Sequence, residues 1–236
     1  MKLIRIAHLY YDLMNLYGER GNVLALSEAL KRQGAKVMVD NVSKSSKIDF
    51  NKYDFIYIGC GTENSLEIAR ADILRYKTEL KKVIKKKFII ATGNALSLFG
   101  TSINGREALD IFNFKSKTVR NRIVGEQVYK TYLVDGPIIA FQNRSIINDI
   151  NENHLFEVIS GNADNQKSKY EGLHINNFYG TSSIGPLLIR NPKLLDKIIK
   201  DFFDEKKYPY KEITDTPEYQ AYNEYLKMFK LEKSVK

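Results

Sequence analysis

The feature that most constrains the fold is a regular alternation of short apolar runs with amphipathic segments in the first part of the chain. The apolar runs have the length and composition of buried strands, and the segments between them repeat their apolar residues at helical spacing. The expected strands cover residues 3–10, 36–42, 54–58 and 88–91, and the expected helices cover about 20–34 and 65–86. Strands that alternate with helices favour a parallel sheet with helices on both faces. The expected fold class is therefore α/β, with a mostly parallel, flavodoxin-like sheet.

The second half of the chain is less regular. Residues 123–134 and 138–142 are expected to form strands around a turn at Gly136, and residues 192–203 and 216–231 are expected to form helices. The polar stretch 161–169 is predicted to be a mobile loop. We expect one domain over residues 1–236, with a C-terminal helical extension over about 204–236.

Composition excludes several kinds of protein. The 236 residues contain one cysteine and three histidines without zinc-ligand spacing, so we expect no disulfide, metal or cofactor. No window approaches the roughly 18 apolar residues of a membrane span, and the start becomes polar too soon for a signal peptide, so a cytoplasmic location is expected. The net charge of +9 permits an anionic partner. The densest basic stretch, 81–87, is typical of the wet face of a helix, and no nucleic-acid motif accompanies it.

Two glycine-rich loops follow expected strands, where α/β sheets bind ligands. In the first, Gly59-Cys60-Gly61, the glycines would let backbone amides approach a ligand oxygen, although a simple tight turn fits the spacing equally well. The second, around Gly93 and Asn94, resembles a nucleophile elbow: a strand, a sharp turn, and a helix whose amino terminus favours negative charge. Glycine adopts the strained elbow conformation easily but supplies no nucleophile.

The order of these motifs resembles the glutaminase subunits of bacterial lipid II isoglutaminyl synthase, which are class I glutamine amidotransferases of the cobyric acid synthase type. The matching segments extend over nearly the whole chain and lie at 13–22, 59–61, 121–125, 171–172, 180–181 and 185–188. The resemblance implies the amidotransferase fold. It also matches Arg122 to the arginine with which the family contacts glutamine.

The resemblance fails at the catalytic positions. The position of the nucleophilic cysteine is Gly93, and that of the catalytic histidine is Ile184. A third departure is the segment 140–144, where relatives carry Gly-Phe-Glu-Asn-His and this chain carries Ala-Phe-Gln-Asn-Arg. In the family, a cysteine thiolate attacks the glutamine amide and ammonia passes to a Mur-ligase-like (MurT-type) synthetase subunit that amidates a peptidoglycan precursor. That chemistry requires the thiolate.

Three hypotheses follow. The first is a noncatalytic amidotransferase-like partner of a Mur-ligase-like subunit, whose pocket still binds glutamine or another small anion through Arg122, Asn94 and the 59–61 loop. The second keeps an enzyme by moving the nucleophile to Cys60, Thr92 or Ser97, although a buried cysteine is usually inert. His174 is a poor candidate base because it falls in a strand-like segment. The third is a basic module that binds an anionic ligand. Arg122 is equally compatible with a simple ion pair to a carboxylate.

Overall fold

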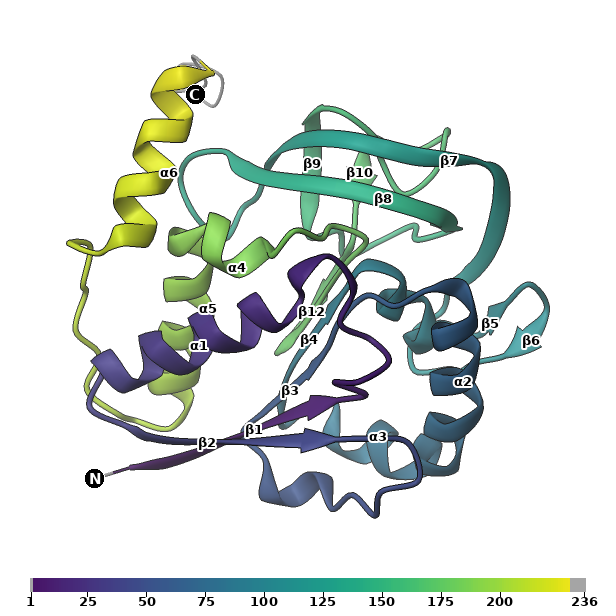
Figure 1. Cartoon of the computed structure of the whole chain (residues 1–236), viewed down its shortest axis with the longest axis horizontal. Helices are drawn as coiled ribbons and strands as arrows, with labels where there is room; N and C mark the ends of the chain where they lie inside the picture. The colour runs from purple at the N-terminus through teal and green to yellow at the C-terminus, as the bar shows by residue number, and fades with distance from the viewer. Residues whose placement is uncertain (1, 230–236) are drawn as a thin grey trace.

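The computed structural model describes residues 2–229, which form two sheets and the helices packed against them (Figure 1). The first sheet has the order β11-β12-β4-β3-β1-β2, and its strands are parallel except for β11. Its strands are β1 (Leu3–Leu9), β2 (Lys36–Val42), β3 (Phe55–Ile58), β4 (Phe88–Thr92), β11 (Leu173–Ile175) and β12 (Phe178–Thr181). The predicted α/β class with a mostly parallel sheet is confirmed.

Helices cover both faces of this sheet because its central strands are apolar on both sides. On one face, Phe55 and Tyr57 pack with α1 (Arg20–Arg32) and α5 (Pro192–Glu205). On the other face, Ile56 and Ile58 pack with α2 (Glu63–Ile73) and α3 (Lys77–Val83). All four residues of β3 are buried, as expected for a strand in the middle of a parallel sheet.

The second sheet is antiparallel apart from one short pairing and lies over the carboxyl ends of the first (Figure 1). Its centre is the long curved hairpin of β7 (Lys115–Lys130) and β8 (Ile138–Asn148). The remaining strands are β5 (Ser102–Ile103), β6 (Arg106–Glu107), β9 (Phe156–Ser160) and β10 (Tyr170–Glu171). Tyr129, Ala140 and Phe156 of this sheet are buried in the same cluster as α1 and α5, so the two sheets share a core.

The prediction of one continuous helix over 65–86 is wrong. The segment is divided into α2 and α3 by a single 3-10 turn, Leu74–Tyr76. Tyr76 leaves helical geometry at φ −104° and ψ 8°, and its buried hydroxyl donates to the Ser46 carbonyl and accepts from the Ile48 amide. These contacts with a distant loop offset the helical bonds lost at the break.

The strand predicted over 123–134 is also shifted. β7 begins eight residues earlier, at Lys115, and ends at Lys130. Its first half is rich in Lys, Arg, Asn and Thr, so it lacks the apolar alternation by which strands are recognised. β8 likewise continues past the predicted end at Gln142 to Asn148. Helix α5 matches the prediction closely, and the helix predicted at 216–231 is α6 (Pro217–Met228), with the last predicted residues outside the described range.

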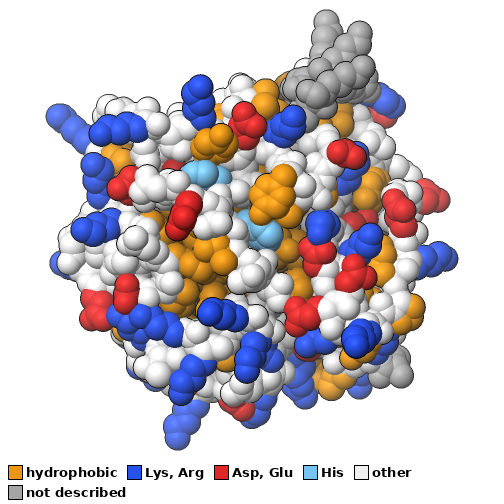
Figure 2. Space-filling view, turned by 180° about the vertical axis from the view of Figure 1, so that it is seen from behind, with side chains coloured by type: hydrophobic (Ala, Val, Ile, Leu, Met, Phe, Trp, Pro, Cys, Tyr) orange, Lys and Arg blue, Asp and Glu red, His pale blue; other side chains and the backbone are white. Residues whose placement is uncertain are grey.

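The surface carries its charge in mixed patches. Figure 2 shows Lys and Arg side chains spread among acidic ones on the face opposite to that of Figure 1, with hydrophobic and His side chains near the middle. The net positive charge is therefore not gathered on that face. Within residues 2–229, no helix is long and apolar enough to cross a membrane.

Candidate functional site

The candidate site lies where three neighbouring parallel strands end, beneath the β7–β8 hairpin. The loops that follow β3, β4 and β12 meet there and bring together Cys60, Gly93 and Ile184. The Gly93 amide donates to the Ser183 carbonyl at 3.1 Å, and the Ile184 amide donates to the Phe141 carbonyl of β8 at 2.8 Å. The structure thus places the predicted elbow and the predicted histidine position in contact.

Gly93 retains the backbone of a nucleophile elbow but has no room for a side chain. Its φ of +62° is in the left-handed region that only glycine adopts without strain. A Cβ atom at this position would lie 2.5 Å from the Cys60 Cβ, 2.8 Å from its Sγ and 3.0 Å from the Ile184 Cγ2. The volume that a nucleophile would need is therefore filled by Cys60 and Ile184.

Cys60 is a buried thiol. Its side chain is only 4% exposed, and burial raises the pKa of the thiol to about 12, so almost none is thiolate at neutral pH. His8 packs edge-on against Tyr57, and His174 lies on β11, where its ring packs on Tyr179 and its Nδ1 is hydrogen-bonded to the Tyr132 hydroxyl. The expectation that Cys60 is an inert buried cysteine is consistent with this setting.

Asn94 joins the two glycine-rich loops. Its Oδ1 accepts from the Gly61 amide at 3.0 Å, and its Nδ2 donates to the Gly61 carbonyl at 2.7 Å. The Gly61 amide, expected from sequence to face a ligand oxygen, is thus already paired within the protein. The predicted helix after the elbow is a 3-10 helix, Gly93–Phe99, in which the buried Ser97 hydroxyl donates to the Asn94 carbonyl at 2.6 Å. The Gly61 amide and the Ser97 hydroxyl are therefore both engaged within the protein.

A buried acid lies directly under the elbow and was not found from the sequence. Glu19 is fully buried, and its Oε2 accepts hydrogen bonds from the hydroxyls of Tyr57 and Thr92. Its Oε1 has no hydrogen-bond partner of normal geometry, although the amides of Cys60 and Gly185 are close enough to favour the ionised form slightly. Burial dominates and raises the pKa of Glu19 to about 7.

This acid belongs to a larger polar network. The Tyr57 hydroxyl also accepts from Asn22 Nδ2 at 2.8 Å, and Asn22 Oδ1 accepts from the Leu188 amide at 2.7 Å. Gly59 makes room for the network, because a Cβ there would lie 2.7 Å from the Met14 carbonyl oxygen and 2.8 Å from the Glu19 Cβ. Glu19 and Asn22 both fall in the 13–22 segment that carries the resemblance, which was the signal available in the sequence.

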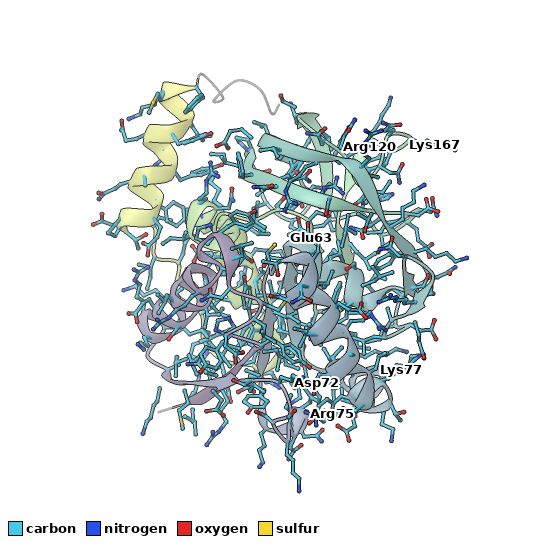
Figure 3. The ribbon with its side chains drawn as sticks, turned by 45° about the vertical axis from the view of Figure 1, so that its right-hand side comes forward. Glu63, Asp72, Arg75, Lys77, Arg120 and Lys167 are labelled. Atoms are coloured by element: carbon cyan, nitrogen blue, oxygen red, sulfur yellow. The ribbon has the colours of Figure 1, made fainter. Side chains whose placement is uncertain are left out.

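Arg122 lies at the rim of the site and is paired with a carboxylate, as one of the two sequence interpretations allowed. Its guanidinium donates to Glu63 Oε1 at 2.7 Å and to Asn143 Oδ1. Glu63 is the first residue of α2, lies under the hairpin in Figure 3, and also accepts from the Ser145 hydroxyl at 2.7 Å. Hydrogen bonds from Ser145 and Arg122 lower the pKa of Glu63, so this ion pair is intact at neutral pH.

A cavity of about 470 Å³ adjoins this rim, next to the carboxyl ends of β1 and β2. It is lined in part by His8, Asn15 and Arg20. Burial lowers the pKa of His8 to about 4, so its ring is neutral at physiological pH. Among residues 2–229 no group of His, Cys, Asp and Glu side chains is arranged to hold a metal ion.

The two layers of helices around the parallel sheet, together with the elbow and glycine loop at its carboxyl edge, define an amidotransferase-like α/β domain. A crystal structure of a glutamine amidotransferase superposes with a TM-score of 0.53 at 15% identity, covering 84% of this chain and 98% of that one. No family model matches the chain.

At the sequence level the chain is similar to lipid II isoglutaminyl synthase (glutamine-hydrolyzing) subunit GatD. It is 28% identical to the Staphylococcus aureus (strain N315) protein over 94% of each chain. It is 29% identical to the Streptococcus pneumoniae (strain ATCC BAA-255 / R6) protein over 86% of this chain and 82% of that protein. The resemblance stated from the motifs is therefore confirmed.

Proposed function

We propose that this chain is a noncatalytic, amidotransferase-like subunit that takes part in amidation of the peptidoglycan precursor lipid II together with a Mur-ligase-like synthetase. Similarity to the GatD subunits over nearly the whole chain supports the pathway and the partner class. The single observation that supports loss of catalysis is the filled elbow, where Cys60 and Ile184 occupy the space of a side chain at Gly93. The synthetase would then receive ammonia from solution.

The chemistry of glutamine hydrolysis requires groups that this site lacks. A nucleophile must reach the amide carbon with a base beside it, and removal of one member of such a unit can lower the rate by roughly a million-fold. Here the elbow carries no side chain, and the position expected for the histidine is Ile184, which is 1% exposed and apolar. The absence of both groups from the elbow favours a structural or regulatory role for the subunit.

The alternative is an enzyme with a relocated nucleophile. Among the candidates Cys60, Thr92 and Ser97, Thr92 has the arrangement most like an activated nucleophile. The Thr92 hydroxyl donates to Glu19, a base with a pKa of about 7, which is the pairing that activates a hydroxyl nucleophile. Both residues are fully buried, however, and Tyr57 shares the same oxygen. A substrate carbonyl would have no path to Thr92, so this pair supports the fold under the elbow.

The proposal is tested by glutamate release from glutamine, measured for the protein alone and with its synthetase. We expect no release above background in either case, and co-purification of the two subunits. The matched control is Cys60→Ala. If the thiol is not catalytic, its removal should leave glutamate release at background. Turnover by the wild type that disappears in Cys60→Ala would establish the relocated nucleophile instead.

A second experiment introduces the thiol and imidazole that the site lacks. Replacing Cys60 by Gly, Gly93 by Cys and Ile184 by His frees the elbow volume and supplies thiol and imidazole together. Gly93→Cys alone is expected to remain inactive because its side chain would collide with Cys60. Glutamate release by the single variant at the rate of the triple variant would show that the volume is not filled as proposed.

A further inference from the structure

A wide basin lies along the first half of β7, and of the site residues described above only Arg122 lines it. Its volume is about 1660 Å³, and it is enclosed by β7, the end of β8, β9 and the loop 161–169. The floor is formed in part by apolar side chains, including Val119, Ile147 and Val158. Polar side chains of Asn121, Asn162 and Gln166 also face it.

The rim of the basin is strongly cationic. Six basic side chains and two acidic ones line it. The basic ones are Lys115, Lys117, Arg120, Arg122, Lys167 and Lys169, and the acidic ones are Asp149 and Glu157. Arg122 pairs with Glu63, but the other five have no carboxylate within salt-bridge distance among residues 2–229. By contrast, Lys77 and Lys81 pair with Glu107 and Asp110. Unpaired like charges around one concave surface favour an anion there.

A local irregularity of β7 places its arginines at this rim. Thr118 pairs with Ile146 and Ile123 pairs with Arg144, so four residues of β7, 119–122, face a single residue of β8. Arg120 and Arg122 both fall within this irregular stretch. Bulges of this kind re-aim side chains and are frequent beside functional sites. Figure 3 labels Arg120 and Lys167 at the same end of the β7–β8 hairpin, and both residues line the basin.

The opposite rim, the loop 161–169, is held by the body of the protein. The Arg144 guanidinium is 4% exposed and donates to the carbonyls of Ala163 and Asp164. Asn165 Nδ2 donates to the Asn148 carbonyl, and Asn165 Oδ1 accepts from the Lys167 amide. Residues 161–169 form a loop as predicted, but its predicted mobility is not supported by these hydrogen bonds, which hold the backbone from which Lys167 and Lys169 extend. A rim fixed in this way loses little entropy when it binds.

We infer that this basin binds a phosphorylated organic molecule, with phosphate groups on Arg120, Lys167 and Lys169 and an apolar body on the β7–β9 floor. Phosphate is favoured because several donors of one charge face a shared space, and Arg pairs bidentately with it. The apolar floor favours an organic phosphoester over inorganic phosphate. A soluble nucleotide and a lipid-linked diphosphate share this chemistry. The inference does not depend on loss of glutaminase chemistry, because none of these three residues contacts Gly93.

Titration calorimetry with ATP and with farnesyl diphosphate tests the inference on the full chain. We expect saturable binding of at least one probe, and the stronger one identifies the source of the phosphate. Lys167→Ala/Lys169→Ala and Arg120→Ala should each weaken binding by about tenfold or more, since each removes charge-assisted hydrogen bonds. All three side chains are exposed, so the variants should melt like the wild type.

The matched control is Lys82→Ala/Lys85→Ala, which removes the same charge from exposed positions on and just after α3, outside the basin. It should leave binding within about twofold of the wild type. The inference is overturned if neither probe binds saturably, or if the control pair weakens binding as much as the basin pair. A DNA duplex that binds more tightly than both probes and depends on the basin residues would also overturn it, in favour of a nucleic-acid surface.

Discussion

At the scale of single residues, Glu19 is expected to make the stability of the protein depend on pH. Its pKa is raised from 4.5 to about 7 by burial, so the folded state holds a proton more tightly than the unfolded state. The contribution of Glu19 to the free energy of unfolding is therefore fully present below about pH 4.5 and is lost, by about 3 kcal/mol, as pH rises through about 7. Glu19→Gln should remove this loss, which denaturant unfolding at several pH values would detect. An identical pH profile for wild type and variant would contradict the buried, protonated acid.

Gly93 should be intolerant of any side chain while Cys60 is present. Gly93→Ala combines left-handed backbone strain with overpacking against Cys60 and Ile184, and should lower the free energy of unfolding by about 2–4 kcal/mol. Adding Cys60→Gly should recover about 1 kcal/mol or more, because the nearest colliding atoms are gone. Strictly additive effects in this double-mutant cycle would mean that the two positions are not in contact.

At the scale of elements, Arg144 is expected to hold the loop 161–169 in place. Its guanidinium donates to the carbonyls of Ile146 and Asp164, and its charge acts on the fully buried carboxyl groups of Asp164 and Glu171. Arg144→Ala should cost about 3 kcal/mol and raise amide hydrogen exchange in 161–169, because it leaves buried acceptors unpaired. Arg106→Ala, at a largely exposed position, is the control and should change neither quantity. Unchanged exchange in the Arg144 variant would show that the loop is held by other contacts.

The elements also show what the sequence could and could not predict. The strands of the first sheet were predictable because β3 and β4 are apolar on both faces, and the loops after them could be placed at one edge. The first half of β7 was not predictable, because most of its side chains are charged or polar and line the rim of the basin, so they show no apolar alternation. The Glu19 network was missed for a related reason, since a buried polar cluster leaves no periodic pattern and depends on contacts between distant segments.

At the scale of the whole molecule, we expect the two sheets to unfold together as one domain. Tyr129 and Phe156 of the second sheet share a buried cluster with Phe55 of the first and with Ile198 and Phe202 of α5. Removing either sheet would expose that cluster, so neither half has an independent core. Far-UV circular dichroism and tyrosine fluorescence should therefore give coincident denaturation curves. Two separated transitions would divide the chain into independent domains.

The central claim is that the fold of a glutamine amidotransferase is kept here without its hydrolytic chemistry. The most direct measurement is glutamate release by this chain, alone and with the proposed synthetase partner, compared with the Cys60→Gly, Gly93→Cys, Ile184→His triple variant. We expect no release by the wild type while the complex forms, since Cys60 and Ile184 fill the elbow. Wild-type turnover that is lost on Cys60→Ala would contradict it and identify a catalytic thiol.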